Sequence, residues 1–539
     1  MSKVIVFGID GASYDFIKKY IKNLPYFKKI KQKGTLVRLK SVIPPVTAPA
    51  WSASYTGMNP GKSGICGMFH INKNNYTNII LNASDRKSKD IYEIASEQTK
   101  KCLILGMPYT YPPRKLNGLL ISGRFTAGGY PEEEAKKLMA EYDYRLYAGK
   151  PPSVNYVKKE LDRRFKMYKE LLEKYEWDLA MLGIEHIDSI GHDMFYENES
   201  AVLDVYKIVD RKLKEISDKV GSDRIFIFSD HGFCSFEKRF YLPRWLVKEN
   251  LMKIKKSIEI KETERKVRKE KLEKLRRKSK NYLFYLMKVL FYKAKQLARK
   301  RFPNLKYPNF LRQFSRFAQV DLYNEERPID YSKSKAFMAT QTISNYGGIF
   351  INTKDNYSQG IVENQDYSEV IKNIKNYLYE LKDSKTNNRI VERVYTRNEL
   401  VSGPYSKYFP DVLFRCRKSI YVSDSMFNIE KGDIIENLPV ANHDINGVFG
   451  SFGKDIIKNK RVECNIKDIM PTILYGLNLK VPKGLDGRVL EDIYKEEYLT
   501  ENPVEYAEME TESKQKRKHY TQDEEEEVKK RLKDLGYID

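Results

Sequence analysis

The chain has 539 residues, of which 41% are hydrophobic, so it can bury a large core as one extended α/β domain with insertions or as two domains. Its five cysteines form no CxxC pair, the N-terminus has no apolar leader, and no apolar run is long enough to span a bilayer. These features exclude a disulfide framework, a zinc finger, a signal peptide and a transmembrane helix, and predict a cytoplasmic location.

Short apolar runs recur along the first half of the chain and predict buried strands at Val4–Ile9 and at residues 103–107, 119–122, 179–183 and 225–229. Helical spacing lies between them, at residues 13–33, 155–175 and 199–219. Strands that alternate with helices predict an α/β fold with a doubly wound, mostly parallel sheet. Ligands of such sheets bind beyond the carboxyl ends of the strands, where Asp10 and the pair Asp230-His231 follow two of these runs.

This alternation breaks near residue 250, and most of the formal net charge of +24 falls in residues 253–301. Strand-like runs return at 348–352 and 411–415, and residues 367–382 have helical spacing. The last segment begins as a polar linker and ends in a helix that Thr521 is suited to cap. The predicted organisation is a core in two parts, 1–250 and 315–498, with a basic helical insertion at 251–314 and a polar linker with a C-terminal helix at 499–539.

Three further patterns have the residue types of metal ligands. Asp188 and His192 are four residues apart, so on a helix they share one face. Asp230 and His231 converge only if the chain leaves strand geometry there, which the following Gly232 makes easy. His443 lies in a stretch that we expect to be a loop. Each pattern alone is also typical of surface charge or a helix cap, but their ordered occurrence beside predicted strand ends indicates a metal site.

A further candidate lies in residues 44–65. Pro49 suits the first turn of a helix that ends near Gly57, which places Thr47 just before the helix N-terminus. Backbone N–H groups and the helix dipole favour a phosphate or a developing alkoxide at that position. The alternative is that Thr47 simply caps the helix.

Taken together, these motifs resemble the alkaline phosphatase superfamily, in particular its type I phosphodiesterase/nucleotide pyrophosphatase branch. The matching segments are Asp10-Gly11, TAPAWSASYTGMNPGKSGI, the DxxxH pair at 188 and 192, SDHG at 229–232, and His443. The stretch at 465–490 is similar to the closing helix and loop of that family. The resemblance covers residues 1–250 and 315–495 and implies an alkaline phosphatase-like core.

The resemblance also implies site roles. Thr47 would be the nucleophile, one metal ion would be held by Asp10, Thr47, Asp230 and His231, and a second by Asp188, His192 and His443. Such mixed donors suit zinc, or manganese as an alternative. The implied activity is a metal-dependent phosphodiesterase or pyrophosphatase that forms a phosphothreonine intermediate at a two-metal site. Three carboxylates and two dications give the site a charge near +1.

Departures from the branch bear on the substrate. The stretch at 64–69 lacks the asparagine with which nucleotide pyrophosphatases of this branch bind phosphoryl oxygen, which argues against nucleotides. Trp51 occupies the position where sulfatases need arginine, which argues against a sulfatase. A phosphomonoesterase or phosphomutase on the same site remains the alternative, and it would require a cation near Thr47, for which Arg38 and Lys62 are the candidates. A non-catalytic, membrane-associated binding protein is the third hypothesis.

The insertion leaves three interpretations open. Residues 282–292 are apolar and flanked by dense Lys and Arg. They are suited to a helical hairpin packed on the core, to an anionic membrane surface reached through residues 253–301, or, less well, to nucleic acid. The predicted substrate is accordingly a small-molecule or lipid-linked phosphate ester, handled by a protein that is cytoplasmic or peripheral at the membrane. The sequence predicts no oligomeric state.

Overall fold

The structure, a computed structural model, describes residues 2–146, 153–255, 329–339, 344–426, 429–430 and 432–535. The predicted basic insertion at 251–314 lies outside the described residues from residue 256 onward, and with it the segment on which the membrane and nucleic-acid interpretations depend. Among the helices that the structure describes, none combines the length and the apolar character needed to cross a membrane.

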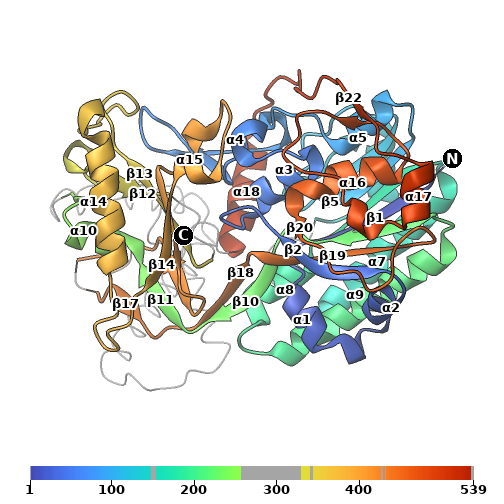
Figure 1. Cartoon of the computed structure of the whole chain (residues 1–539), viewed down its shortest axis with the longest axis horizontal. Helices are drawn as coiled ribbons and strands as arrows, with labels where there is room; N and C mark the ends of the chain where they lie inside the picture. The colour runs from blue at the N-terminus through green and yellow to red at the C-terminus, as the bar shows by residue number, and fades with distance from the viewer. Residues whose placement is uncertain are drawn as a thin grey trace, which may run out of the picture.

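A nine-stranded mixed sheet forms the centre of the larger lobe (Figure 1). Its neighbouring strands are parallel from β9 to β6, whereas β19 is antiparallel to both of its neighbours. The mostly parallel sheet expected from the sequence is therefore confirmed. In spatial order the strands are β20 (Cys464–Asn465), β2 (Thr35–Lys40), β19 (Asn446–Gly453), β9 (Arg224–Phe228), β1 (Val4–Ile9), β8 (Leu179–Ile184), β5 (Cys102–Pro108), β6 (Gly118–Gly123) and β7 (Gly129–Tyr130).

Helices cover both faces of this sheet, because alternate residues of its buried strands point to opposite sides. In β1, Val4 and Val6 belong to one hydrophobic cluster, and Ile5 and Phe7 to the other. The first cluster includes α3 (Thr47–Thr56), α5 (Ile91–Glu97) and α16 (Ile469–Gly476). The second includes α1 (Tyr14–Lys19), α2 (Pro25–Lys33), α6 (Glu132–Glu141), α7 (Val154–Lys174), α8 (His186–Met194) and α9 (Glu199–Lys219).

The long helices α7 and α9 match the predicted ranges closely. The segment predicted as one helix at 13–33 is instead divided into α1, a short 3₁₀ turn at Ile21–Asn23, and α2. Pro25 explains the break, since it lacks an N–H for an interior helical bond but is well placed as the first residue of a new helix.

A smaller lobe has its own hydrophobic cluster and a four-stranded antiparallel sheet (Figure 1). This sheet has the order β12 (Ala336–Met338), β13 (Tyr346–Ile351), β15 (Val412–Cys416), β14 (Val391–Thr396). Nearby elements are α10 (Leu242–Lys248), α14 (Tyr367–Glu380), α15 (Arg397–Leu400), and a three-stranded sheet of β16 (Ile420–Ser423), β11 (Lys238–Tyr241) and β17 (Ile435–Glu436).

A two-stranded ribbon connects the lobes. The chain leaves the larger lobe along β10 (Gly232–Phe236) and returns along its antiparallel partner β18 (Val440–Asp444), directly before β19 (Figure 1). The remaining short elements are α4 (Pro60–Ser63), the hairpin of β3 (Phe69–Ile71) and β4 (Asn78–Ile80), and α17 (Glu496–Glu501).

The C-terminal segment runs back over the larger lobe. β22 (Tyr506–Ala507) pairs with β21 (Val481–Pro482), and Lys518 contacts Asn82 and Ser84. The segment ends in α18 (Gln522–Asp534), whose N-cap is Thr521, as the sequence indicates. Val528 and Leu532 of α18 are buried in the same cluster as α3.

Candidate active site

Seven side chains that are far apart along the sequence meet at the carboxyl edge of the central sheet. Asp10 follows β1, Asp188 and His192 lie on α8 after β8, and Asp230 with His231 occupies the turn between β9 and β10. The helix α3 begins one residue earlier than the sequence suggests, so Thr47 is its first residue and not the residue before it. The fully buried members of the set are Asp10, Thr47, Asp188, Asp230, His231 and His443.

One group of side chains surrounds His231. Its Nε2 atom lies 3.2 Å from Asp230 Oδ2 and 3.6 Å from Asp10 Oδ1. The hydroxyl of Thr47 lies 3.3 Å from the same nitrogen. Asp230 and His231 lie in the turn between β9 and β10, outside strand geometry, so their side chains can point to the same place.

A second group surrounds Asp188. Its Oδ1 atom is 3.4 Å from His192 Nε2 and 3.2 Å from His443 Nε2, and the two histidine nitrogens are 3.1 Å apart. The groups adjoin each other, since Asp188 Oδ1 lies 4.0 Å from His231 Nε2 and the rings of His231 and His443 stack with centroids 3.5 Å apart.

The local structure predicted for His443 is wrong. We expected a loop, but His443 belongs to β18 and lies opposite Phe233 of β10. The pairing partner of β18 is about two hundred residues earlier in the chain, so no local pattern marks this stretch as a strand. The pairing of β18 with β10 directs the His443 side chain from the ribbon between the lobes toward the site.

The donor set fits divalent cations. His231 Nδ1 lies 3.0 Å from the carbonyl of Gly232 and His443 Nδ1 lies 2.9 Å from the carbonyl of Pro45. A carbonyl only accepts, so each Nδ1 carries the proton and each Nε2 presents a lone pair to the cluster. Among the described residues, the buried atoms Asp10 Oδ1 and Asp230 Oδ2 accept no hydrogen bond. Two sets of potential ligands result: Asp10, Asp230 and His231, and Asp188, His231 and His443.

Burial determines the protonation of these potential ligands. It lowers the pKa of His231 and of His443, so both imidazoles are neutral near pH 7 and able to bind a cation. Burial, together with the neighbouring carboxylates, raises the pKa of Asp10 and of Asp230 well above the usual range. A bound cation relieves this cost, because it neutralises carboxylates that are otherwise close together and shielded from water.

The sequence interpretation missed Arg124. This buried residue follows β6, and its guanidinium lies 2.8 Å from Asp10 Oδ2 and 2.5 Å from Asp188 Oδ2. Burial acts to raise the pKa of Asp188, but the Arg124 charge and His192 outweigh it and hold this pKa well below its usual range. The signal available in the sequence was a basic residue directly beyond the carboxyl end of a predicted strand.

The two cations considered from the sequence pair with carboxylates outside the candidate ligand set. Arg38 pairs with Asp15 at 2.5 Å, and Lys62 pairs with Asp486 at 2.7 Å. With two dications bound, the three carboxylates and the Arg124 guanidinium would give the site a charge near +2, compared with the +1 expected without this arginine.

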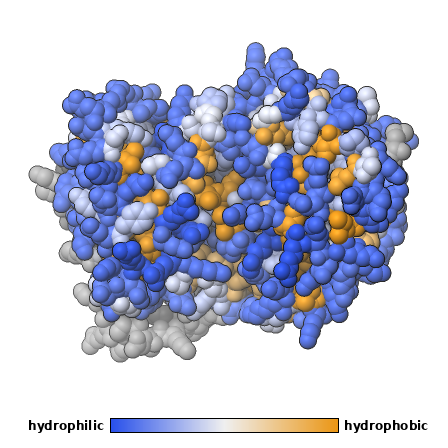
Figure 2. Space-filling model, viewed as in Figure 1, coloured by the Kyte–Doolittle hydropathy of each residue, from blue (hydrophilic) through white to orange (hydrophobic). Residues whose placement is uncertain are grey.

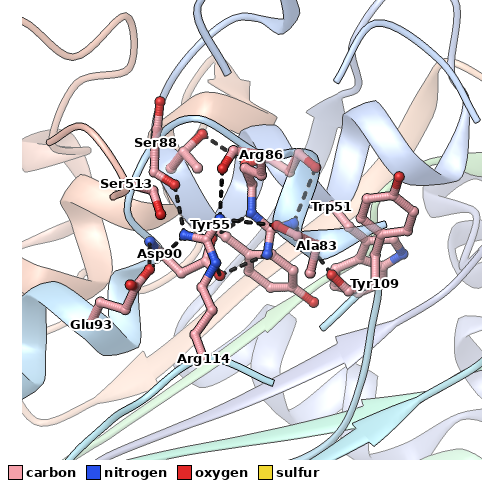
Figure 3. Close-up of polar contacts among 12 residues, drawn as sticks. Trp51, Tyr55, Ala83, Arg86, Ser88, Asp90, Glu93, Tyr109, Arg114 and Ser513 are labelled. Carbon is pink, nitrogen blue, oxygen red and sulfur yellow. Dashed lines mark hydrogen bonds and ion pairs between the residues drawn. The ribbon is translucent and has the colours of Figure 1, made fainter. Parts of the chain in front are cut away.

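A buried network of ion pairs and hydrogen bonds contacts α3 (Figure 3). Arg86 forms a bidentate ion pair with Asp90, at 2.6 and 2.7 Å, and donates a hydrogen bond of 3.2 Å to Ser52 of α3. Arg114 points toward the same carboxylate and donates to Glu93 at 2.7 Å (Figure 3). The network fixes the helix whose N-terminus presents Thr47.

A small cavity of about 40 Å³ borders Val46, the residue before Thr47, and is lined mainly by residues with aliphatic and aromatic side chains. It lies between the lobes, where Figure 2 shows apolar residues gathered in a hollow. Larger-lobe residues on its wall include Val46, next to Thr47, and the smaller lobe supplies residues of β13 and β15. Lining side chains include Val46, Cys66, Phe69, Tyr346, Phe350 and Leu413.

Comparison with solved structures finds the same fold at low sequence identity. Phosphonoacetate hydrolase from Sinorhizobium meliloti, in complex with phosphonoformate, is 13% identical with a TM-score of 0.54, over 88% of this chain and 95% of that chain. An inactive threonine-to-alanine variant of murine ectonucleotide pyrophosphatase/phosphodiesterase 5, in complex with AMP, is 14% identical with a TM-score of 0.51. That likeness covers 92% of this chain and 100% of the murine chain.

No protein of curated function matches the sequence. Residues 4–304, more than half of the chain, match the family described as type I phosphodiesterase/nucleotide pyrophosphatase. This family is metal-dependent and acts on phosphate esters, in agreement with the cluster of potential ligands beside Thr47. The chain therefore belongs to the type I phosphodiesterase/nucleotide pyrophosphatase family, within the alkaline phosphatase superfamily, and is a phosphoric ester hydrolase.

Proposed function

We propose that this protein cleaves small-molecule phosphate diesters through a phosphothreonine formed on Thr47. The observation that carries the proposal is the convergence of the ligand set on this hydroxyl: Thr47 Oγ1 lies 3.3 Å from His231 Nε2, within a cluster of buried carboxylates and neutral imidazoles. A buried threonine at the first position of a helix is well placed for a phosphoryl group, because the N-terminus of a helix favours a bound anion.

Two ions would be held by the residues named from the sequence. Asp10, Thr47, Asp230 and His231 would hold one, and Asp188, His192 and His443 the other. The mixture of nitrogen and oxygen donors suits zinc, with manganese as the alternative. Bound divalent ions lower the pKa of a coordinated hydroxyl and stabilise the charge that develops on phosphoryl oxygens.

The proposed reaction has two displacements. In the first, Thr47 Oγ1 forms a bond to phosphorus, the bond to the leaving alcohol breaks, and the alcohol takes up a proton. In the second, water attacks the phosphothreonine, which releases a phosphate monoester and returns the threonine hydroxyl. The N–H groups at the start of α3 hold the phosphoryl oxygens in both steps, and the Arg86 network keeps α3 in place.

Two observations favour a diester over a monoester. The cations Arg38 and Lys62, which a monoesterase was expected to use, form ion pairs with Asp15 and Asp486 instead. None of the described residues that line the cavity next to Val46 has a charged side chain, which suits an uncharged ester group better than a second anionic oxygen. A lipid-linked phosphate ester also has an uncharged ester group, so the proposal includes substrates of this class.

Turnover of two chromogenic esters tests the proposal. Wild type, Thr47→Ala and Thr56→Ala are compared on bis(p-nitrophenyl) phosphate and p-nitrophenyl phosphate, each with added zinc or manganese. Thr56 is the matched control, because it is a buried threonine of the same helix whose hydroxyl donates to Ser52. We expect T47A to lose at least about a thousandfold in diester kcat, and T56A to stay within about tenfold of wild type.

Equal or greater turnover of the monoester would instead favour a phosphomonoesterase or phosphomutase. Full diester activity in T47A would overturn the phosphothreonine intermediate. No turnover of either ester by wild type would favour the non-catalytic binding protein.

A further inference from the structure

We infer that Arg124 is a positioning residue that ties the two metal positions to each other. The inference rests on the proposed assignment of Asp10 to one ion and Asp188 to the other. It concerns how the chain links the two carboxylates. Arg124 contacts each of them through a separate nitrogen, whereas His231 approaches both with the single atom Nε2, at 3.6 and 4.0 Å.

The two carboxylates divide their oxygens in the same way. Asp10 turns Oδ1 toward His231, at 3.6 Å, and Oδ2 toward Arg124, at 2.8 Å. Asp188 turns Oδ1 toward His192 and His443, at 3.4 and 3.2 Å, and Oδ2 toward Arg124, at 2.5 Å. In each case one oxygen is left for a cation on the histidine side, while the other is held by the guanidinium.

The fork of the guanidinium suits this task. Nη1 contacts Asp10 and Nη2 contacts Asp188, so the fixed distance between the two nitrogens sets the separation of the two carboxylates. A lysine has a single ammonium group and lacks this rigid separation. We expect this geometry to make the spacing of the ions a property of the protein, present before either ion binds.

Arg124 is itself held firmly. Its backbone has φ of +72°, which is unfavourable for a residue with a side chain and persists only where the surroundings impose it. The next residue, Phe125, accepts a hydrogen bond at its carbonyl from Arg531 of α18, and its ring lies under the Arg124 guanidinium at 5.3 Å. The C-terminal helix therefore supports the loop that presents the guanidinium.

The consequence for binding has a definite sign. Removing the guanidinium takes a positive charge away, which by itself would strengthen cation binding, but it also frees both carboxylates to rotate or repel each other. Loss of residues that orient metal ligands typically costs 10- to 100-fold in metal affinity. Since Arg124 orients a ligand of each ion, we expect Arg124→Met to weaken both binding steps by about 10- to 100-fold.

Zinc titration of metal-free protein tests this inference without any use of activity. Wild type, Arg124→Met, Arg124→Lys and Arg224→Met are titrated against a competing chromophoric chelator, and unfolding temperatures are recorded for the metal-free forms. Arg224 is the matched control, because it is a buried arginine that pairs with Asp455 but lies at the start of β9, at the opposite end of this strand from the candidate ligands. We expect R124M to weaken both steps, R124K to be intermediate, and R224M to lower the unfolding temperature with zinc affinity within about threefold of wild type.

The outcomes separate the inference from the proposed function. Two zinc ions bound by R124M with wild-type affinity would overturn the positioning role and leave the two-ion site intact. Weakening of one step alone would overturn the link between the positions. Absence of zinc or manganese binding in wild type would overturn the proposed site and the inference together. If R124M does not fold, the zinc affinity of R124K tests the inference in its place. Wild-type affinity of R124K in both binding steps would overturn it.

Discussion

His231 contributes one ring nitrogen to both groups of side chains in the site, with Nε2 3.2 Å from Asp230 and 4.0 Å from Asp188. The sequence indicated this residue because it follows a buried apolar run and precedes a glycine. The same argument, a polar residue after a strand, located Asp10, and helical spacing located Asp188 with His192. Arg124 was not found, because a basic residue after a strand is common and its role depends on contacts that only the folded chain creates.

His70 provides a residue-scale prediction about pH. Its ring stacks on Tyr408 with centroids 4.1 Å apart, and burial lowers its pKa from 6.5 to about 4. Between these values the unfolded chain binds a proton that the folded chain does not, so stability is full above pH 6.5 and falls toward pH 4. We expect His70 to account for about 1–2 kcal/mol of the stability lost between pH 7 and pH 5.

Chemical unfolding of wild type, His70→Gln and His519→Gln at pH 7, 6 and 5 measures this effect. The H70Q variant should lose less stability on acidification than wild type, whereas H519Q, which changes an exposed histidine, should follow wild type. Parallel pH dependence in H70Q and wild type would show that the buried ring is protonated as readily in the folded state.

At the scale of elements, the turn after β1 determines where two of the proposed metal ligands lie. Gly11 has φ of +72°, and its N–H donates a 3.1 Å hydrogen bond to Asp230 Oδ1. A Cβ atom at this position would lie 2.9 Å from Cα of Asp188. The end of a strand, the start of α8 and the turn after β9 are therefore packed without room for one methyl group.

Gly11→Ala should weaken zinc binding by at least about tenfold, because Asp188 has to move away from the added methyl group. Zinc titration checks this result, with Gly484→Ala as control. Gly484 also has positive φ, at +78°, but a Cβ there meets nothing within 4 Å, so G484A carries only the backbone cost of about 1–2 kcal/mol. Equal zinc affinity in G11A and G484A would contradict the steric explanation.

The strands that the sequence predicted are those with a local signal. β1, β5, β8 and β9 are continuous apolar runs and lie buried in the parallel part of the sheet. β18 and β19 have no such runs, because β19 is rich in glycine and β18 ends in the polar residues Asn442, His443 and Asp444. Both become strands through partners elsewhere in the chain, so their pairing depends on tertiary contacts that a local pattern does not contain.

At the scale of the whole molecule, the C-terminal segment is part of the larger lobe. Tyr111 donates a hydrogen bond to Glu524 of α18 and stacks on Tyr520, while Arg517 pairs with Asp85 at 2.9 Å. Leu532 is fully buried. Together these contacts join the end of the chain to the loops that surround Arg86 and Arg124.

Leu532→Ala should therefore destabilise the larger lobe by about 2–5 kcal/mol, the usual cost of a cavity left by a buried leucine. Thermal unfolding measures the effect, with Lys529→Ala on the exposed side of the same helix as control. An unchanged unfolding temperature in L532A, with α18 alone becoming sensitive to protease, would show that the helix is an independent appendage.

The position of β19 has a consequence for how the protein is made. This strand lies between β9 and β2, yet it follows the entire smaller lobe along the chain. During synthesis, β2 and β9 emerge early and wait with unpaired edges until Asn446–Gly453 leaves the ribosome. His443 arrives in the same stretch of chain, so a nascent polypeptide gains the last of its proposed cation ligands as its central sheet closes.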